Sequence, residues 1–232
     1  SLSLSLSQFG EMANKNRSSF QLSALPVTIF IHLLVIAVTT FVLVWLLHFR
    51  EGLAFKSDIK QKIFNVHPLL MIIGFILIEG EAIMAYKTAP GMSRKVQKLF
   101  HLIMHLVALL AGIVGIYAVF KFHHELEIPD MYTLHSWLGM STISLFGLQW
   151  FLAFFSFWWP RARKPTRARL APWHISFGMI IFLMAILTAE TGLVEKFIFL
   201  GLRRSQEALL VNFTGLLILL FGISVGLTVL LP

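Results

Sequence analysis

Six apolar runs, each long enough to cross a lipid bilayer, follow one another along the chain. A membrane-spanning α-helix needs about 20 mostly apolar residues at a rise of about 1.5 Å per residue. The runs are Pro26–His48, Val66–Tyr86, Leu99–Phe120, Leu134–Trp159, Pro172–Thr191 and Ala208–Leu231. Because no connector is long enough to house another domain, these runs predict an all-α fold, a bundle of six transmembrane helices.

The composition excludes several classes of protein. Hydrophobic residues make up 57% of the 232 residues and charged residues only 13%, whereas soluble domains carry about 25% charged residues. A soluble globular protein and a disordered chain are therefore both excluded. The absence of cysteine excludes a disulfide framework, a thiolate zinc site, an iron–sulfur cluster and covalently attached c-type haem.

The beginning of the chain differs in character from the rest. It reads SLSLSLSQFG, is mainly polar up to residue 25, and lacks the charged region and the small-residue cleavage site of a signal peptide. We expect residues 1–25 to be a flexible tail or a cloning remnant. Residues 26–232 then form a single six-span domain.

Basic residues are distributed unequally between the two sides of the predicted bundle. The chain has 19 basic and 11 acidic residues, which give a net charge of +8. Eleven of the basic residues fall on the side with the N-terminus, the 2–3 connector and the 4–5 connector, and eight fall on the other side. The positive-inside rule then predicts that both termini are cytosolic. Since the charge follows the membrane faces, it indicates a lipid bilayer as partner and not nucleic acid.

Four of the nine histidines begin consecutive spans. They are His67 in span 2, His101 in span 3, His135 in span 4 and His174 in span 5. Successive spans run antiparallel, so His67 and His135 are expected near the non-cytosolic face and His101 and His174 near the cytosolic face. An ionisable group inside a membrane is costly and is a functional candidate by default, although histidines at span ends can also reach the interface simply to stay hydrated.

Two histidine pairs on a four-helix core are the arrangement that binds haem iron from both sides. Without cysteine the haem is non-covalent and b-type, and two axial imidazoles leave no open position on iron, so we assign no catalytic residue. Gly139 and Gly178, four residues after their histidines, and Gly74, two turns after His67, leave room for the macrocycle. His105 competes with His101 for the cytosolic site, because the two share a helix face; depth in the bilayer favours His101.

These residues lie in motifs that resemble the cytochrome b561 family, six-span dihaem oxidoreductases that depend on ascorbate. The likeness covers residues 28–230 and rests on FNVHPLLMIIGF, GEAIMAYK, RKVQKLFH, YTLHSWLG, LAPWH, GLVEKFIF and EALLVNF. The resemblance implies two haems b in spans 2–5, one held by His67 and His135 and the other by His101 and His174. It is strongest to the plant-type ferrireductases, in which cytosolic ascorbate reduces monodehydroascorbate or a ferric chelate across a vacuolar, other endomembrane or plasma membrane.

The same resemblance implies two substrate sites. The cytosolic ascorbate site matches Arg94, Lys98, Arg167 and Ala168, and the opposite site matches Phe122, His123 and Tyr132. Phe157 stands where relatives have an aromatic hydroxyl, which puts one substrate contact in doubt. Because ascorbate is a monoanion at neutral pH, the cations at the cytosolic site suit it, although the positive-inside rule alone also supplies basic residues there.

Further expectations concern partners and alternative functions. Arg50 and Lys121 are candidates to pair with haem propionates, and family members often form homodimers. Two other functions stay open: a haem-bearing membrane anchor of a larger redox complex, and a transporter that moves protons or metal ions through intramembrane histidine and glutamate. The grouping of the histidines at two depths, and not at the midplane, favours the redox function.

Overall fold

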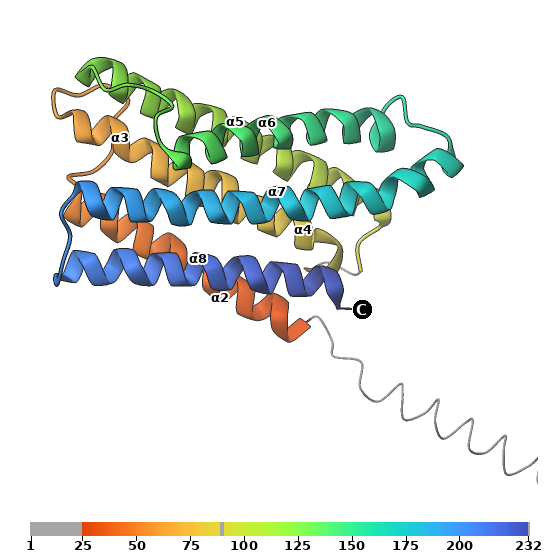
Figure 1. Ribbon diagram of the computed structural model, residues 1–232. Helices are drawn as coiled ribbons and strands as arrows, with labels where there is room; N and C mark the ends of the chain where they lie inside the picture. Colours follow the sequence, from red (N-terminus) through yellow and green to blue (C-terminus); the bar gives the residue numbers. More distant parts are fainter. Residues whose placement is uncertain (1–24, 89–90, 232) are drawn as a thin grey trace, which may run out of the picture.

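Six long helices lie side by side in the computed structural model, which describes residues 25–88 and 91–231 (Figure 1). Each is long and apolar enough to cross a membrane, and their bounds are Leu25–Phe49, Lys60–Thr88, Arg94–Leu126, Leu134–Trp158, Lys164–Phe199 and Gln206–Leu230. The predicted all-α, six-span bundle is confirmed. The predicted tail of residues 1–25 lies outside the described residues, apart from Leu25, which begins the first helix.

Several spans combine α-helical and π-helical segments. Span 1 is α2 (Leu25–Val44) with η1 (Trp45–Phe49), and span 2 is α3 (Lys60–Leu69), η2 (Leu70–Leu77) and α4 (Ile78–Thr88). Span 3 is α5 (Arg94–Leu126), span 4 is α6 (Leu134–Ala153) with η3 (Phe154–Trp158), and spans 5 and 6 are α7 (Lys164–Phe199) and α8 (Gln206–Leu230). The π-helical segment of span 2 follows Pro68, which has no N–H to donate to the helix ladder.

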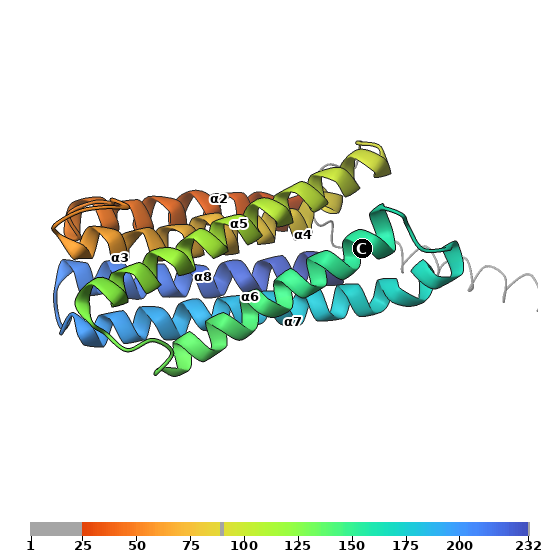
Figure 2. The same cartoon turned by 90° about the horizontal axis from the view of Figure 1, so that it is seen from above.

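Spans 2–5 form a four-helix ring, and spans 1 and 6 pack beside it. In the ring α3 and α4 contact α5, α5 contacts α6, α6 contacts α7, and η2 closes the ring against α7. Helix α8 packs on α7 and α4 and is itself covered by α2, as Figures 1 and 2 show from two directions. We call the end where α2 begins and α8 ends the terminal end, and the end with connectors 50–59, 127–133 and 200–205 the opposite end.

The helices continue past the limits of the apolar runs. Span 3 was expected at Leu99–Phe120 and occupies Arg94–Leu126, while span 5 was expected at Pro172–Thr191 and occupies Lys164–Phe199. Polar caps decide where helices begin: the side-chain oxygen of Ser93 accepts a hydrogen bond from the N–H of Val96. Pro172, the first residue of the apolar run, lies inside α7, which begins at Lys164 with a proline in its first turn.

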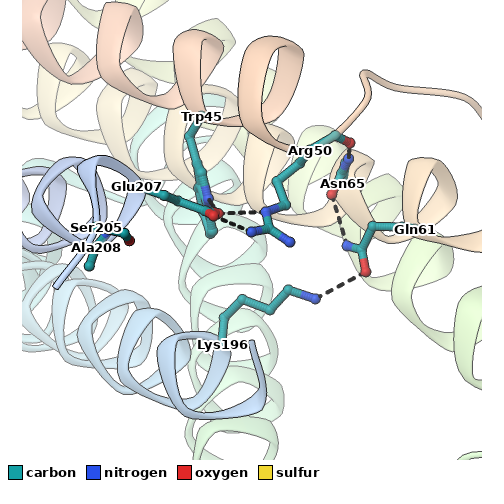
Figure 3. A network of polar contacts seen from close by, with 8 residues as sticks. All are labelled: Trp45, Arg50, Gln61, Asn65, Lys196, Ser205, Glu207 and Ala208. Atoms are coloured by element: carbon teal, nitrogen blue, oxygen red, sulfur yellow. Dashed lines mark hydrogen bonds and ion pairs between the residues drawn. The ribbon is translucent and has the colours of Figure 1, made fainter. Parts of the chain in front are cut away.

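A polar network joins four segments at the opposite end (Figure 3). The carboxylate of Glu207, in the first turn of α8, accepts a hydrogen bond of 2.9 Å from the indole N–H of Trp45. It also forms an ion pair with the guanidinium of Arg50. The amide of Asn65 on α3 donates to the backbone oxygen of Arg50 at 2.6 Å. Glu207 is 8% exposed and Asn65 is 1% exposed. The network therefore holds the end of span 1 and the start of span 6 against the start of span 2.

Replacing Glu207 with Gln should destabilise the protein by about 3 kcal/mol, because the half-buried guanidinium of Arg50 would lose its counter-charge. For a chain of this size that lowers the midpoint of thermal unfolding by roughly 6 to 12 °C. The measurement is thermal unfolding of the detergent-solubilised protein.

The control is Asp58→Asn, which removes one negative charge from an exposed residue at the same end and should change the midpoint little. A double variant, Arg50→Met with Glu207→Leu, should recover most of the loss, because no unpaired charge remains buried. Equal midpoints for Glu207→Gln and Asp58→Asn would contradict the structural role of this ion pair.

Candidate functional site

The four histidines at the span starts form two facing pairs inside the four-helix ring. The ring centres of His67 on α3 and His135 on α6 are 6.0 Å apart, with the ring planes at 89°. Those of His101 on α5 and His174 on α7 are 6.1 Å apart, with the planes at 77°. One pair lies toward the opposite end of the bundle and the other toward the terminal end, as the antiparallel order of the spans predicts.

Backbone carbonyls orient three of these imidazoles. The Nδ1 atom of His67 lies 3.1 Å from the oxygen of Gly115, that of His101 lies 2.8 Å from the oxygen of Ala82, and that of His135 lies 2.9 Å from the oxygen of Thr188. A carbonyl oxygen only accepts, so each Nδ1 carries the proton and each Nε2 keeps its lone pair. This is the tautomer that a metal-ligating histidine needs.

The spacing of each pair suits one metal ion between two imidazoles. A metal–nitrogen bond of about 2 Å, with the ring centre about 1.1 Å beyond the nitrogen, places two axial imidazole centres about 6 Å apart. The observed centres are 6.0 and 6.1 Å apart. The donor set and its spacing therefore fit a haem iron with two axial histidines.

His105 lies deeper than His101 and is oriented by its own helix. Its Nδ1 atom lies 2.9 Å from the backbone oxygen of His101, one turn earlier. Its ring stacks on Phe146 with centres 5.6 Å apart and planes at 12°. In this position the ring of His105 packs against an apolar neighbour, while the ring of His101 faces His174.

A cavity of about 670 Å³ opens around the terminal-end pair. Its lining includes His101, His174 and Gly178, and also Lys98, Arg167 and Ala168, which the resemblance assigned to the ascorbate site. Lys98 and Arg167 are half-buried, and one guanidinium nitrogen of Arg167 donates to the oxygen of Ala162 at 3.1 Å. The structure thus brings three of the four predicted cytosolic-site residues to one cavity with a histidine pair.

Arg94, the fourth predicted residue of that site, lies above the cavity wall. Its guanidinium carbon is 6.0 Å from the ring centre of Tyr86, and one of its nitrogens donates to the side chain of Gln97 at 3.3 Å. Tyr86 itself lines the cavity, with its ring centre 5.6 Å from that of His101. Tyr86 lies in the motif GEAIMAYK, but only the packing of α4 on α5 reveals its place beside the histidine pair.

Phe157 also belongs to the cavity wall. Its ring centre is 5.3 Å from that of His174. A phenylalanine here offers an apolar surface beside the histidine and no hydroxyl, so the doubt raised about this contact stands.

The three residues predicted for the opposite site lie near the His67–His135 pair. Phe122 packs edge-on against Phe64, and Phe64 in turn contacts His67, with ring centres 5.2 and 6.1 Å apart. The Nδ1 atom of His123 is 2.8 Å from a carboxylate oxygen of Asp130. His123 lies beyond the apolar run Leu99–Phe120, and α5 continues through it to Leu126.

Tyr132 lies in the connector that leads from α5 to α6. Its side chain is 55% exposed at the opposite end of the bundle. The connector returns toward α5 through the contact of Asp130 with His123. Tyr132 is therefore accessible at the face where the resemblance expects the second substrate.

The glycines near the histidines have different uses. Gly178 lines the terminal-end cavity as expected, but a Cβ at Gly74 would lie 2.7 Å from Cβ of Ala111, so this glycine lets η2 approach α5 and leaves no room for a macrocycle. Gly139 lies against Thr188, where an added Cβ would be in ordinary contact at 3.4 Å. Gly192 was not anticipated: an added Cβ would lie 2.6 Å from Cε1 of His135.

The fold and the site together define a multi-pass membrane protein whose four-helix core presents two facing histidine pairs, one toward each end of the bundle. A family model described as eukaryotic cytochrome b561 matches residues 66–200, a stretch that includes all four histidines. The chain belongs to the cytochrome b561 family.

Relatives from plants and animals agree with this membership. The chain is 50% identical over 213 residues to a probable ascorbate-specific transmembrane electron transporter 1 of Oryza sativa subsp. japonica, covering 90% of this chain and 91% of the relative. It is 44% identical over 212 residues to transmembrane ascorbate ferrireductase 1 of Arabidopsis thaliana, covering 90% and 88%. A transmembrane ascorbate-dependent reductase of Sus scrofa is 39% identical over 194 residues, covering 82% and 75%.

Proposed function

We propose that this protein is a transmembrane oxidoreductase that takes electrons from ascorbate on one side of a membrane and delivers them to an acceptor on the other. The observation that carries the proposal is the pair of facing histidine sites, one toward each end of the bundle. The names of the relatives, which are ascorbate-specific electron transporters and ascorbate-dependent reductases, support ascorbate as the donor.

Two non-covalent haems b are the proposed cofactors. His67 with His135 would hold one, and His101 with His174 the other. A haem with two axial imidazoles supplies one-electron chemistry at iron and no open position for substrate. The residues of this chain fix the imidazoles: the carbonyls of Gly115, Ala82 and Thr188 keep Nδ1 protonated and Nε2 free.

The terminal end is proposed as the ascorbate side. Lys98 and Arg167 line the cavity around His101 and His174, and Ala168 lies beside them. Arg94 is one helical turn before Lys98 on the same face of α5. These cations concentrate a monoanionic donor at the mouth of the cavity and hold it within reach of the first site.

The opposite end is proposed as the acceptor side, with Phe122, His123 and Tyr132 at the site. The acceptor is monodehydroascorbate or a ferric chelate. The hydrogen bond from His123 to Asp130 supports a defined orientation of this imidazole at the surface. The aromatic contacts of Phe122 with Phe64, and of Phe64 with His67, connect this surface to the second pair.

The proposal also covers the side of the membrane on which the termini lie, the membrane that holds the protein, and its oligomeric state. The greater number of basic residues at the terminal end supports cytosolic termini, in a vacuolar, other endomembrane or plasma membrane. Residues 26–232 act as one domain. We further propose a homodimer, for which exposed apolar side chains of α5 and α6 such as Leu110 and Leu148 offer a surface within the bilayer.

The experiment that tests the proposal is a reduced-minus-oxidised absorption spectrum of the purified protein, recorded after ascorbate is added. A b-type α-band should appear, because electrons from ascorbate reach the bound haems. A protein that shows no such band with a strong reductant lacks the cofactor. A band that dithionite produces and ascorbate does not would exclude ascorbate as the donor.

Replacing His101 with Ala should remove the haem at the terminal end and reduce the α-band to about half, because one of two axial ligands is lost there. His105→Ala is the matched control, four residues along the same helix, and should keep the full band. Haem per protein is measured by a pyridine haemochrome assay. Two haems retained in the His101 variant would overturn the assignment of this ligand.

Neutralising Arg94 and Lys98 together, as Gln, should slow reduction by ascorbate about tenfold at low salt and less at high salt, since electrostatic attraction is screened. Haem content should not change. The control changes Arg203 and Arg204, exposed cations at the opposite end, to Gln and removes the same charge. The rate of haem reduction by ascorbate is measured for both variants by stopped-flow spectroscopy. Equal rates in the two variants would mean that Arg94 and Lys98 serve membrane topology alone.

A further inference from the structure

Lys196, in the motif GLVEKFIF, has a charge that the proposed function does not use. It lies near the end of α7, at the opposite end of the bundle, and is half-buried. Figure 3 shows its side chain extending from α7 toward α3, where its Nζ atom is 3.4 Å from the side-chain oxygen of Gln61. The same atom lies 3.7 Å from the ring centre of Phe64.

The direct contacts of the Lys196 ammonium in this network are neutral, while Glu207 and Arg50 act on it electrostatically from further away. Gln61 is an amide and Phe64 an aromatic ring, and the ion pairs found among residues 25–88 and 91–231 do not include Lys196. The carboxylate of the network, Glu207, is held by Trp45 and Arg50. A half-buried cation is normally compensated by an anion, so the surroundings of Lys196 suit a negatively charged group that is not part of the chain.

Two neighbours of Lys196 contact the imidazoles of the opposite-end pair. Phe64, on which the ammonium rests, has its ring centre 6.1 Å from that of His67. Gly192, one turn earlier on α7, lies directly against the ring of His135. Because α7 runs toward the opposite end, Lys196 stands about one turn nearer that end of the bundle than Gly192.

The other two candidate cations are already engaged. The guanidinium of Arg50 is paired with Glu207. The Nζ atom of Lys121 is 2.6 Å from the backbone oxygen of Phe55 and 3.8 Å from a carboxylate oxygen of Glu125. Arg50 and Lys121 stay candidates for the haem propionates, but Lys196 is the cation of the three whose direct contacts are all neutral.

We propose that Lys196 pairs with a propionate carboxylate of the haem that His67 and His135 hold. This inference rests on the proposed function. Haem b carries two carboxylates on one edge, and a cation that rests on the neighbour of His67, one turn beyond the neighbour of His135, is suited to receive one of them. The contact anchors the haem and fixes its orientation in the ring of helices.

The test compares natural haem b with its dimethyl ester, which has no carboxylates, in protein produced without haem and then loaded. A His101→Ala background leaves the opposite-end haem alone, and transfer of haem to apomyoglobin gives the rate of loss. Natural haem should leave on the order of tenfold more slowly than the ester. Lys196→Met should abolish this difference, and Lys196→Arg, which keeps a cation, should retain most of it.

The matched control is Lys121→Met, which removes the same charge at the same end and should preserve the difference between natural haem and ester. Resonance Raman spectra give a second readout, because the propionate bending band should shift in Lys196→Met and not in Lys121→Met. A tenfold difference that persists in Lys196→Met, or one that is lost equally in Lys121→Met, would overturn the pairing; so would the absence of any difference in the parent protein.

Failure of this inference is distinguishable from failure of the proposed function. If the protein binds no b-type haem, the proposed function fails. If both haems bind and ascorbate reduces them while the ester leaves no faster than natural haem, only the pairing with Lys196 is wrong. A slower reduction of the acceptor in Lys196→Met, with an unchanged rate of haem loss, would instead assign the lysine to the acceptor and contradict the pairing.

Discussion

Hydrogen bonds from histidine Nδ1 atoms to backbone carbonyls of neighbouring helices are the interaction on which the site depends. In the hydrocarbon region water is not available, so each N–H must find its acceptor within the protein. His67 uses a carbonyl of α5, His101 one of α4, and His135 one of α7. The orientation of each imidazole is therefore set by the packing of the helix beside it, and the four-helix ring and the two sites form together.

Close helix contact makes these hydrogen bonds possible. A helix carbonyl that already accepts from its own ladder can be reached by an imidazole only where the two backbones come near each other. Gly115 supplies such a carbonyl, and an added Cβ there would lie 3.3 Å from Cβ of Leu70. Gly192 has no side chain, and this leaves space for the ring of His135, which an added Cβ would displace. Small residues at helix contacts in membranes thus serve packing and ligand geometry at once.

Much of this arrangement could be predicted from the order of residues along the chain. Apolar length located the six spans, and the antiparallel order of spans paired the four histidines correctly in space. The prediction for Gly74 was wrong, because this glycine serves the contact of η2 with α5. The pairing of Arg50 with Glu207, 157 residues away, was not predicted, because it depends on how the helices pack side by side. Helix ends were also wrong, because caps such as Ser93 and not apolarity determine where a helix begins.

The two ends of the bundle differ in how their charges are compensated. At the opposite end Arg50 pairs with Glu207, Lys60 with Glu125, and His123 with Asp130. At the terminal end the cations that line the cavity, among them Lys98 and Arg167, have no carboxylate partner among the ion pairs of the described residues. An anionic donor is therefore attracted to the terminal end more strongly than to the other. This difference in surface charge suits an anionic donor at the terminal end and agrees with the proposed entry of electrons there.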